Sequence, residues 1–189
     1  MTTTSGPGYK PYWEDQVDGE GRWKNDKPPN GGDLAALRRG LGRQAGTVPQ
    51  MWRFYRTYAE HPDAPALVAE HAALALYGLH QQSQRTPMHR KGVGLGEAMR
   101  RLKSSDGVNE DGVTRRFNAA ATATSLDELV AHLRGLITLL RGKSIALDYT
   151  RLSKDLRMWT RSEGAASTRR YWGLQFYARP TDEPDRVDG

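Results

Sequence analysis

The chain has 189 residues, a formal net charge of +6 and no cysteine, which suits one domain or two small ones with a usable core. The lack of cysteine excludes disulfide bonds, thiol catalysis and zinc sites with cysteine ligands, and it fits the reducing cytoplasm in which we expect the protein. No apolar run approaches the roughly 20 residues of a membrane span, and the first residues match neither a signal nor a transit peptide, so we expect no membrane partner.

The positive charge is concentrated in the middle of the chain. Residues 34–179 hold 23 lysines and arginines against 12 acidic residues, whereas residues 1–33 hold four against six and residues 180–189 one against four. Arginine outnumbers lysine by 21 to 7, and its planar guanidinium forms paired hydrogen bonds with phosphate. Because no exposed apolar helix face accompanies these cations, they favour nucleic acid over a membrane surface; a basic surface without any ligand is the plainer alternative.

Residues 1–32 are rich in glycine, proline and charge and show no helical or strand periodicity. We predict a flexible arm, whose aromatic residues can dock on the body of the protein or on a neighbour. A helical domain over residues 33–179 follows, with Asp33 as the N-cap of its first helix, over residues 34–43. A second helix is predicted over residues 49–60, because a proline lies in its first turn.

The middle of the chain predicts a buried helix followed by a basic loop. Residues 64–83 are alanine-rich and apolar on most sides, as expected of a central helix. Residues 85–94 carry several basic side chains between proline and glycine, which indicates a flexible basic loop. Short helices are predicted next, over residues 95–103 and 113–121.

Two capped amphipathic helices follow. Ser125 and Glu128 form an S-x-x-E capping box, which predicts a helix from Leu126 that ends near Gly142. Asp148 is the predicted N-cap of the next helix.

A last helix is predicted over residues 167–178, before an acidic tail at residues 180–189 that we expect to be disordered. Sustained alternation of apolar and polar residues, the mark of a strand, is missing from every window of the sequence. The chain therefore predicts an all-α fold, a compact bundle of about seven or eight helices that can divide into two packed sub-bundles.

The residues needed for catalysis are not found in known arrangements. Gly142-Lys143-Ser144 resembles the end of a phosphate-binding loop, but the glycine required five residues earlier is Ile137, and a helix precedes it instead of a strand. The five histidines form no pair with metal-ligand spacing. We expect no enzyme, no metal and no cofactor, and we regard a nuclease or a nucleotide-hydrolysing enzyme as the least favoured interpretation.

One aromatic cluster has two interpretations. Interleaved with arginines, it can stack unpaired bases, but its spacing of three and four residues is more typical of a packed core. Its members are Trp52, Phe54, Tyr55 and Tyr58.

Several segments together resemble the small subunit, or CasB family, of the type I-E CRISPR Cascade complex. They are GVGLGEAM at residues 92–99, the helix start Arg115-Arg116-Phe117, LVAHLRGLITLLR at 129–141, LDYTRLSKDLRMW at 147–159 and RRYWGLQFYA at 169–178. The resemblance covers roughly residues 34–179, so the arm and the tail lie outside it.

The resemblance implies a non-catalytic subunit in antiviral defence, which forms a homodimer beside other Cascade subunits and contacts crRNA and target DNA. It implies a role in stabilising the R-loop and its displaced strand by sequence-independent contacts. Family positions suggest as nucleic-acid ligands Arg38, Arg39, Arg115, Arg116, Arg134 and Arg161. Charge and position alone add Arg90, Lys91, Arg141 and Lys143. The alternative is a basic helical module that docks an acidic protein partner.

Overall fold

The computed structural model describes residues 10–57, 61 and 63–178. These residues form eight α-helices, two 3₁₀ helices and, instead of a sheet, two isolated bridges, so the predicted all-α fold is confirmed. The α-helices are α1 (Tyr12–Asp15), α2 (Gly31–Arg38), α3 (Pro65–Gln81), α4 (Leu95–Lys103), α5 (Glu110–Ala121), α6 (Leu126–Gly142), α7 (Tyr149–Trp159) and α8 (Ser162–Phe176). The 3₁₀ helices are η1 (Lys24–Asp26) and η2 (Pro49–Phe54).

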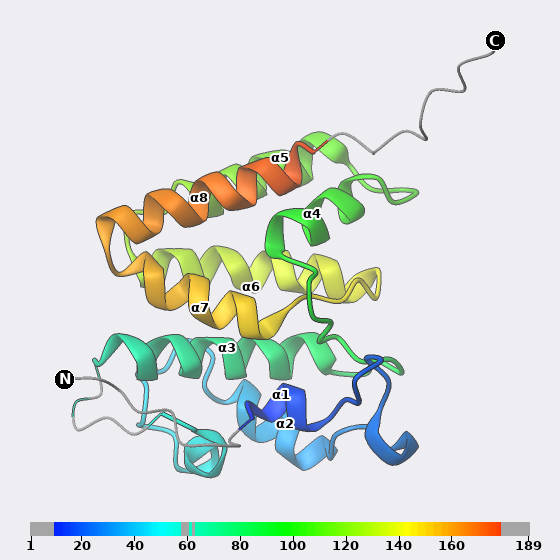
Figure 1. The fold of residues 1–189 in the computed structure, drawn as a ribbon, viewed down its shortest axis with the longest axis vertical. Coiled ribbons are helices and arrows are strands. Elements are labelled where there is room, and N and C mark those ends of the chain that lie inside the picture. Colours follow the sequence, from blue (N-terminus) through cyan, green and yellow to red (C-terminus); the bar gives the residue numbers. More distant parts are fainter. Residues whose placement is uncertain (1–9, 58–60, 62, 179–189) are drawn as a thin grey trace.

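Helix α3 lies at the centre of the fold, between α2 on one side and α6 and α7 on the other (Figure 1). Most of its residues are buried, as predicted for this segment. Helix α2 approaches it so closely at Gly78 that an added Cβ would lie 2.7 Å from the Cβ of Leu37. Only glycine allows this contact, because any larger residue would push the two helices apart.

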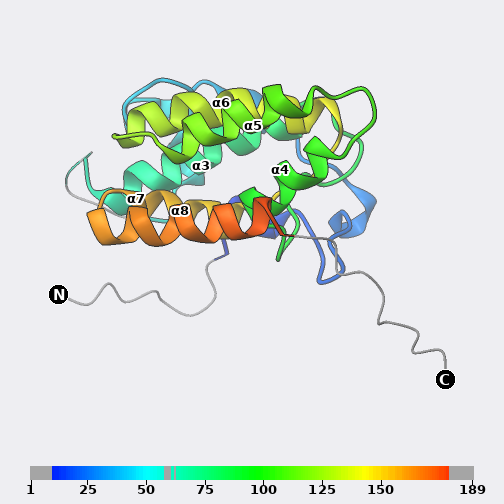
Figure 2. The same ribbon diagram turned by 90° about the horizontal axis from the view of Figure 1, so that it is seen from above.

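The C-terminal helices complete the bundle beyond α6 and α7. Helix α8 packs on α4 and α7, and α5 packs on α4 and α6. Figure 2 shows α5 and α6 on one face of the molecule and α7 and α8 on the opposite face. One hydrophobic core runs through all these layers, from Tyr12 in α1 to Phe176 in α8. Among the described helices, none combines the length and the apolar character of a membrane-crossing segment.

The helix caps predicted from sequence are present, with one shift. The Ser125 hydroxyl accepts a hydrogen bond from the Glu128 amide at 3.2 Å, and an Asp148 carboxylate oxygen accepts one from the Arg151 amide at 2.9 Å. The Glu128 carboxylate, however, accepts from the amide of Thr124 at 2.7 Å, one residue earlier than in a standard capping box. These hydrogen bonds lie outside the core, and together they fix where α6 and α7 begin.

The first predicted cap is wrong. Helix α2 starts at Gly31, and its N-cap is Asn30, whose side chain accepts a hydrogen bond from the Gly32 amide at 2.7 Å. Asp33 lies in the first turn instead and accepts hydrogen bonds from the Tyr12 hydroxyl at 3.1 Å and the Arg53 guanidinium at 2.5 Å. The start of this helix was not predicted because two consecutive glycines form it, and glycine has a low helix propensity. Helices α5 and α8 also begin a few residues earlier than predicted.

The predicted helix over residues 49–60 is a short 3₁₀ helix that ends at Phe54. The chain is extended from Tyr55 because the buried Glu70 carboxylate accepts hydrogen bonds from the amides of Arg56 and Thr57 at 2.7 and 2.8 Å. The core prediction for the aromatic cluster is correct for Phe54 and wrong for Trp52, which is 60% exposed. Tyr58 lies outside the described residues.

The structure differs from the predicted flexible arm over residues 10–32. Tyr12 and Trp13 are buried, and the Trp13 indole nitrogen donates a hydrogen bond to the Thr150 hydroxyl at 2.9 Å. Its ring packs beside Tyr77 of α3 and Tyr149 of α7, with centroids 6.2 and 5.9 Å away. Docking of the arm's aromatic residues on the body was one of the two alternatives, but single anchoring side chains have no periodicity, so the sequence pattern did not show which of them dock. Residues 1–9 of the arm and the predicted tail, residues 180–189, lie outside the described part.

Replacing Trp13 with alanine should lower the free energy of unfolding by about 3–5 kcal/mol, because a large buried ring and its hydrogen bond are lost. Urea unfolding followed by circular dichroism measures this change. The matched control is Tyr177→Ala, which removes an aromatic ring that is 60% exposed. Equal losses for the two variants would contradict the anchoring role of Trp13.

Buried histidines make the stability of the fold depend on pH. The Nδ1 atom of His80 lies 3.0 Å from the Tyr149 hydroxyl, and burial lowers the pKa of His80 from 6.5 to about 3. Burial also lowers the pKa values of His71 and His89. Neutral His80 therefore favours the folded state above pH 6.5, and this contribution is lost as the pH falls towards 3.

The free energy of unfolding should thus fall below about pH 6.5, with His80 contributing up to about 1.4 kcal/mol per pH unit. Thermal unfolding over this pH range, compared between the wild type and His80→Gln, isolates this contribution. The slope should be smaller in His80→Gln than in the wild type and than in the control His61→Gln, which alters an exposed histidine. The same slope in all three proteins would refute the assignment.

Candidate nucleic-acid interface

Most of the predicted nucleic-acid ligands lie at the surface. Exposed side chains are those of Arg39, Arg90, Lys91, Arg115, Arg116, Arg134, Lys143 and Arg161, whereas Arg38 and Arg141 are partly buried. The elements that carry them lie on different faces, because α5 and α6 are opposite α7 (Figure 2). A single copy of the chain therefore offers separate groups of cations.

Arg115 and Arg116 are fixed on α5 by the packing of their neighbour. Phe117 is buried and stacks on Phe176 of α8, with ring centroids 4.2 Å apart. This contact turns the two arginines outward. Within the described part of the chain, neither guanidinium has an ion-pair or hydrogen-bond partner, so both keep their full capacity for phosphate.

Arg134 of α6 lines a groove of about 700 Å³ between α3 and α6. Small residues of both helices, such as Ala72 and Ala131, line the same groove, which keeps it open. Arg43, from the turn after α2, lies at the same groove and is exposed. Nothing in the sequence singles out Arg43, because it is a lone cation in a glycine-rich segment and lines the same groove as Arg134 only in the folded chain.

The basic loop at residues 85–94 is held in place, in contrast to the predicted flexibility. The Arg90 amide donates to the Leu147 carbonyl at 3.1 Å, and the Tyr149 amide donates to Nδ1 of His89 at 3.1 Å. Arg90 is exposed, and its guanidinium has no acidic partner among the described residues. Lys91 is partly neutralised, since its ammonium lies 3.6 Å from the carboxylate of Glu14.

Arg141 and Lys143 have structural roles that weaken their candidacy. The Arg141 guanidinium donates to the Leu79 carbonyl at 3.3 Å and to the Gln82 side chain at 3.1 Å, which ties α6 to the end of α3. The Lys143 ammonium donates to the Asp106 carbonyl at 2.8 Å. Phosphate would have to compete with these bonds.

Helix α7 carries cations of two kinds. Arg151 is held by Asp155, with Nε 2.8 Å from a carboxylate oxygen, and it stacks over Tyr171 at 3.9 Å from the ring centroid. Burial raises the pKa of Asp155, although its hydrogen bonds to Trp172 and Arg151 oppose the rise. Arg151 thus joins α7 to α8 and is a structural residue.

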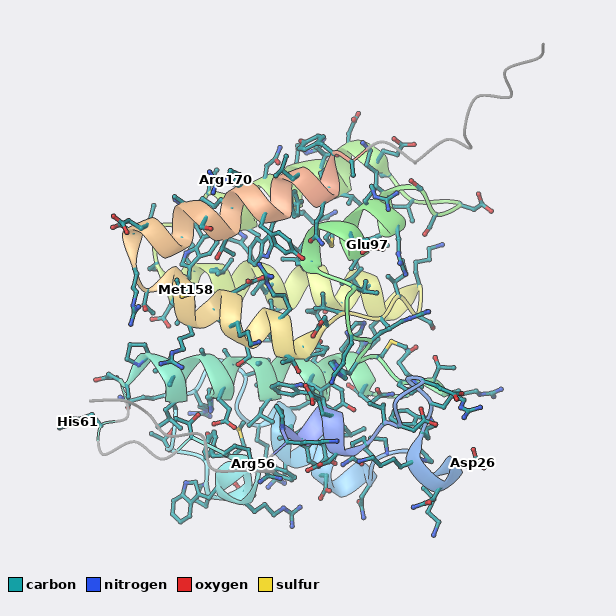
Figure 3. The ribbon with its side chains drawn as sticks, in the orientation of Figure 1. Asp26, Arg56, His61, Glu97, Met158 and Arg170 are labelled. Carbon is teal, nitrogen blue, oxygen red and sulfur yellow. The ribbon has the colours of Figure 1, made fainter. Side chains whose placement is uncertain are left out.

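The other cations of α7, Lys154 and Arg157, are exposed and point away from the core. They line a small groove of about 220 Å³ between α1, α3 and α7, and with Arg161 they follow a spacing of three and four residues. The sequence shows this spacing as a basic helix face suited to an anionic ligand, although Lys154 and Arg157 were not selected as individual ligands. Figure 3 shows that exposed arginines reach as far as Arg170 on α8, at the end of the molecule opposite Arg56.

The described residues contain no group of three or more histidine, aspartate or glutamate side chains arranged to hold a metal ion. The pockets near the cations are open grooves lined by small and apolar residues and by basic side chains, with Asp63, Asp127 and Glu70 also in their walls. Such surfaces suit an extended anionic backbone better than a compact ligand.

The comparisons with known proteins agree with this architecture. The crystal structure of CasB from Thermobifida fusca is 36% identical, covers 78% of this chain and 85% of its own, and superposes with a TM-score of 0.65. A chain of a CRISPR RNA-guided surveillance complex is 26% identical, with 76% and 80% covered and a TM-score of 0.61. CasB of M. ruber, at 24% identity with 80% and 86% covered and a TM-score of 0.64, supports the fold alone.

No curated protein matches the chain. The profile of the CRISPR-associated protein Cse2 family, in contrast, matches residues 33–177, which include α3 to α8 and the exposed arginines described above. The chain belongs to the Cse2 (CasB) family of CRISPR-associated proteins.

Proposed function

We propose that this protein is a non-catalytic small subunit of the crRNA-guided Cascade complex and binds nucleic acid without reading its sequence. The observation that carries the proposal is the pair Arg115 and Arg116, exposed on α5 and without partners among the described residues, in a chain of the Cse2 family. Similarity to a chain of a CRISPR RNA-guided surveillance complex supports the assembly.

The proposed role is to stabilise the R-loop and its displaced DNA strand in the cytoplasm, as part of antiviral defence. Exchange of a DNA duplex for a guide–target duplex is nearly balanced in free energy, so contacts to phosphate can tip it. Such contacts need exposed arginines on a rigid scaffold and no base readout. The bundle supplies the rigid scaffold, because the core fixes the helices, and it supplies the exposed arginines, which lie outside that core.

The exposed cations lie on two separate faces of the bundle, so we propose a different set of partners for each face. Those of α5 and α6 lie on one face and those of α7 on the other (Figure 2). We infer that one face holds crRNA or target DNA while the other faces the displaced strand, a second copy of the chain or another Cascade subunit.

Affinity for single-stranded DNA should fall steeply with salt. If about six phosphates are neutralised, the log–log slope of the association constant against salt should be about −4. Fluorescence anisotropy with a labelled oligonucleotide of mixed sequence measures this slope, and a second sequence of equal length should give the same value. A slope near zero would contradict direct binding and favour an acidic protein partner.

Replacing Arg115 and Arg116 together with glutamine should weaken binding and reduce the magnitude of that slope by about 1.4, because two phosphate contacts are lost. The fold should survive, since both side chains are exposed.

The matched control is Arg101→Gln, which removes an exposed arginine already paired with Glu97 within α4. This control should leave the slope unchanged. An unchanged slope in the double variant as well would remove α5 from the binding surface.

A further inference from the structure

Trp52 is a tryptophan that the fold leaves in solvent, with 60% of its surface exposed. In a 3₁₀ helix, residues three apart lie on the same edge. Met51 and Phe54 occupy the buried edge of η2, at 0% and 4% exposure, so Pro49 and Trp52 lie on an exposed edge. The exposure of this ring is therefore imposed by the packing of its neighbours.

The indole ring of Trp52 is also held in one position. Its nitrogen donates a hydrogen bond to the Gly46 carbonyl at 2.7 Å. Gly46 has a φ of +79°, which favours glycine, and its amide donates to the Tyr55 hydroxyl at 3.3 Å. Because its only polar atom is bonded internally, the ring offers a ligand only aromatic carbon. A fixed ring loses little conformational entropy when a ligand stacks on it.

Cations lie next to this ring. A hollow of about 650 Å³ is lined by Trp52, Arg53 and Gln50 of η2, by Arg39 at the end of α2 and by Asp33, whose carboxylate is paired with Arg53. Arg39 is exposed, and its guanidinium has no partner among the described residues. The Arg53 guanidinium lies 2.5 Å from Asp33 and 4.7 Å from the centroid of the Phe54 ring, so it is fixed at the side of the hollow. The volume is within the range of small-molecule sites.

We propose that this hollow binds one unpaired nucleotide, with its base stacked on Trp52 and its phosphate on Arg39; the inference rests on the proposed function and deepens it. Stacking on an aromatic ring tolerates any base, which suits binding without sequence readout. An apolar side chain of a protein partner would cover the ring but leave Arg39 and Gln50 without polar partners. A nucleotide supplies a base to stack on the Trp52 ring and a phosphate to bind Arg39.

The test compares a thymidine oligonucleotide with an abasic oligonucleotide that has the same number of phosphates. Trp52→Ala in the full chain should weaken binding of the thymidine oligonucleotide by about five- to 150-fold and leave binding of the abasic one unchanged. Trp52→Phe should restore most of the affinity, whereas Trp52→Leu, which keeps apolar surface without an aromatic ring, should not. Arg39→Gln should weaken both oligonucleotides and reduce the magnitude of the salt slope by about 0.7.

Tyr177→Ala serves as the matched control, because it removes an equally exposed ring just after α8, at the end of the molecule opposite α2 (Figure 1). It should bind both oligonucleotides like the wild type. Salt-dependent binding that is the same in Trp52→Ala and the wild type would overturn the nucleotide site and leave the proposed function intact.

Absence of salt-dependent binding by the wild type would overturn both proposals. Loss of co-assembly with the other Cascade subunits in Trp52→Ala, with unchanged affinity for oligonucleotides, would identify a protein-docking site and also overturn the nucleotide site.

Discussion

The burial of α3 on nearly all sides is the constraint on which the rest of the structure depends. Four buried polar residues of this helix need partners, because an unpaired polar group in the core is costly. Glu70 accepts the amides after η2, His71 bonds the Gly40 carbonyl and Tyr55, and His80 bonds Tyr149 of α7. Gln81 bonds the loop after α3, at the Thr86 carbonyl and the Met88 amide. Each bond ties a neighbouring segment to α3. The burial of α3 thus positions η2, the turn after α2 and the start of α7, and with them the cations and the exposed ring that these segments carry.

The same core divides the arginines into structural and available ones. Arg141 and Arg169 donate to backbone carbonyls and join helices, and Arg169 also lies over the Trp159 ring at 4.8 Å. Arg115, Arg116 and Arg134 have no such bonds among the described residues. A net charge counts both kinds equally, although only the second kind can bind phosphate without giving up a contact in the protein. For this reason the charge of the chain indicates a class of partner, and only the fold indicates which residues meet it.

Local signals predicted the C-terminal half of the fold well. The caps at Ser125 and Asp148 depend on residues within one helical turn, so they are visible in the sequence. The position where Trp13 docks and the early end of η2 could not be predicted, because they depend on Thr150 and Glu70, which are distant in the sequence. For the candidate site, the sequence-based selection of ten cations includes eight that are exposed in the structure. It gave no sign that Arg141 is engaged, or that the fold brings Arg43 to the groove that Arg134 lines, since both are products of tertiary packing.

The central claim is that arginines without intramolecular partners hold the phosphate backbone. Its most direct test is arginine footprinting of the full chain with a dicarbonyl reagent and mass spectrometry, with and without single-stranded DNA. The account predicts that DNA protects Arg115, Arg116 and Arg134 and leaves the modification of Arg101 and Arg141 unchanged, because these two already have partners in the protein. Equal protection of all five arginines, or protection of none, would contradict it.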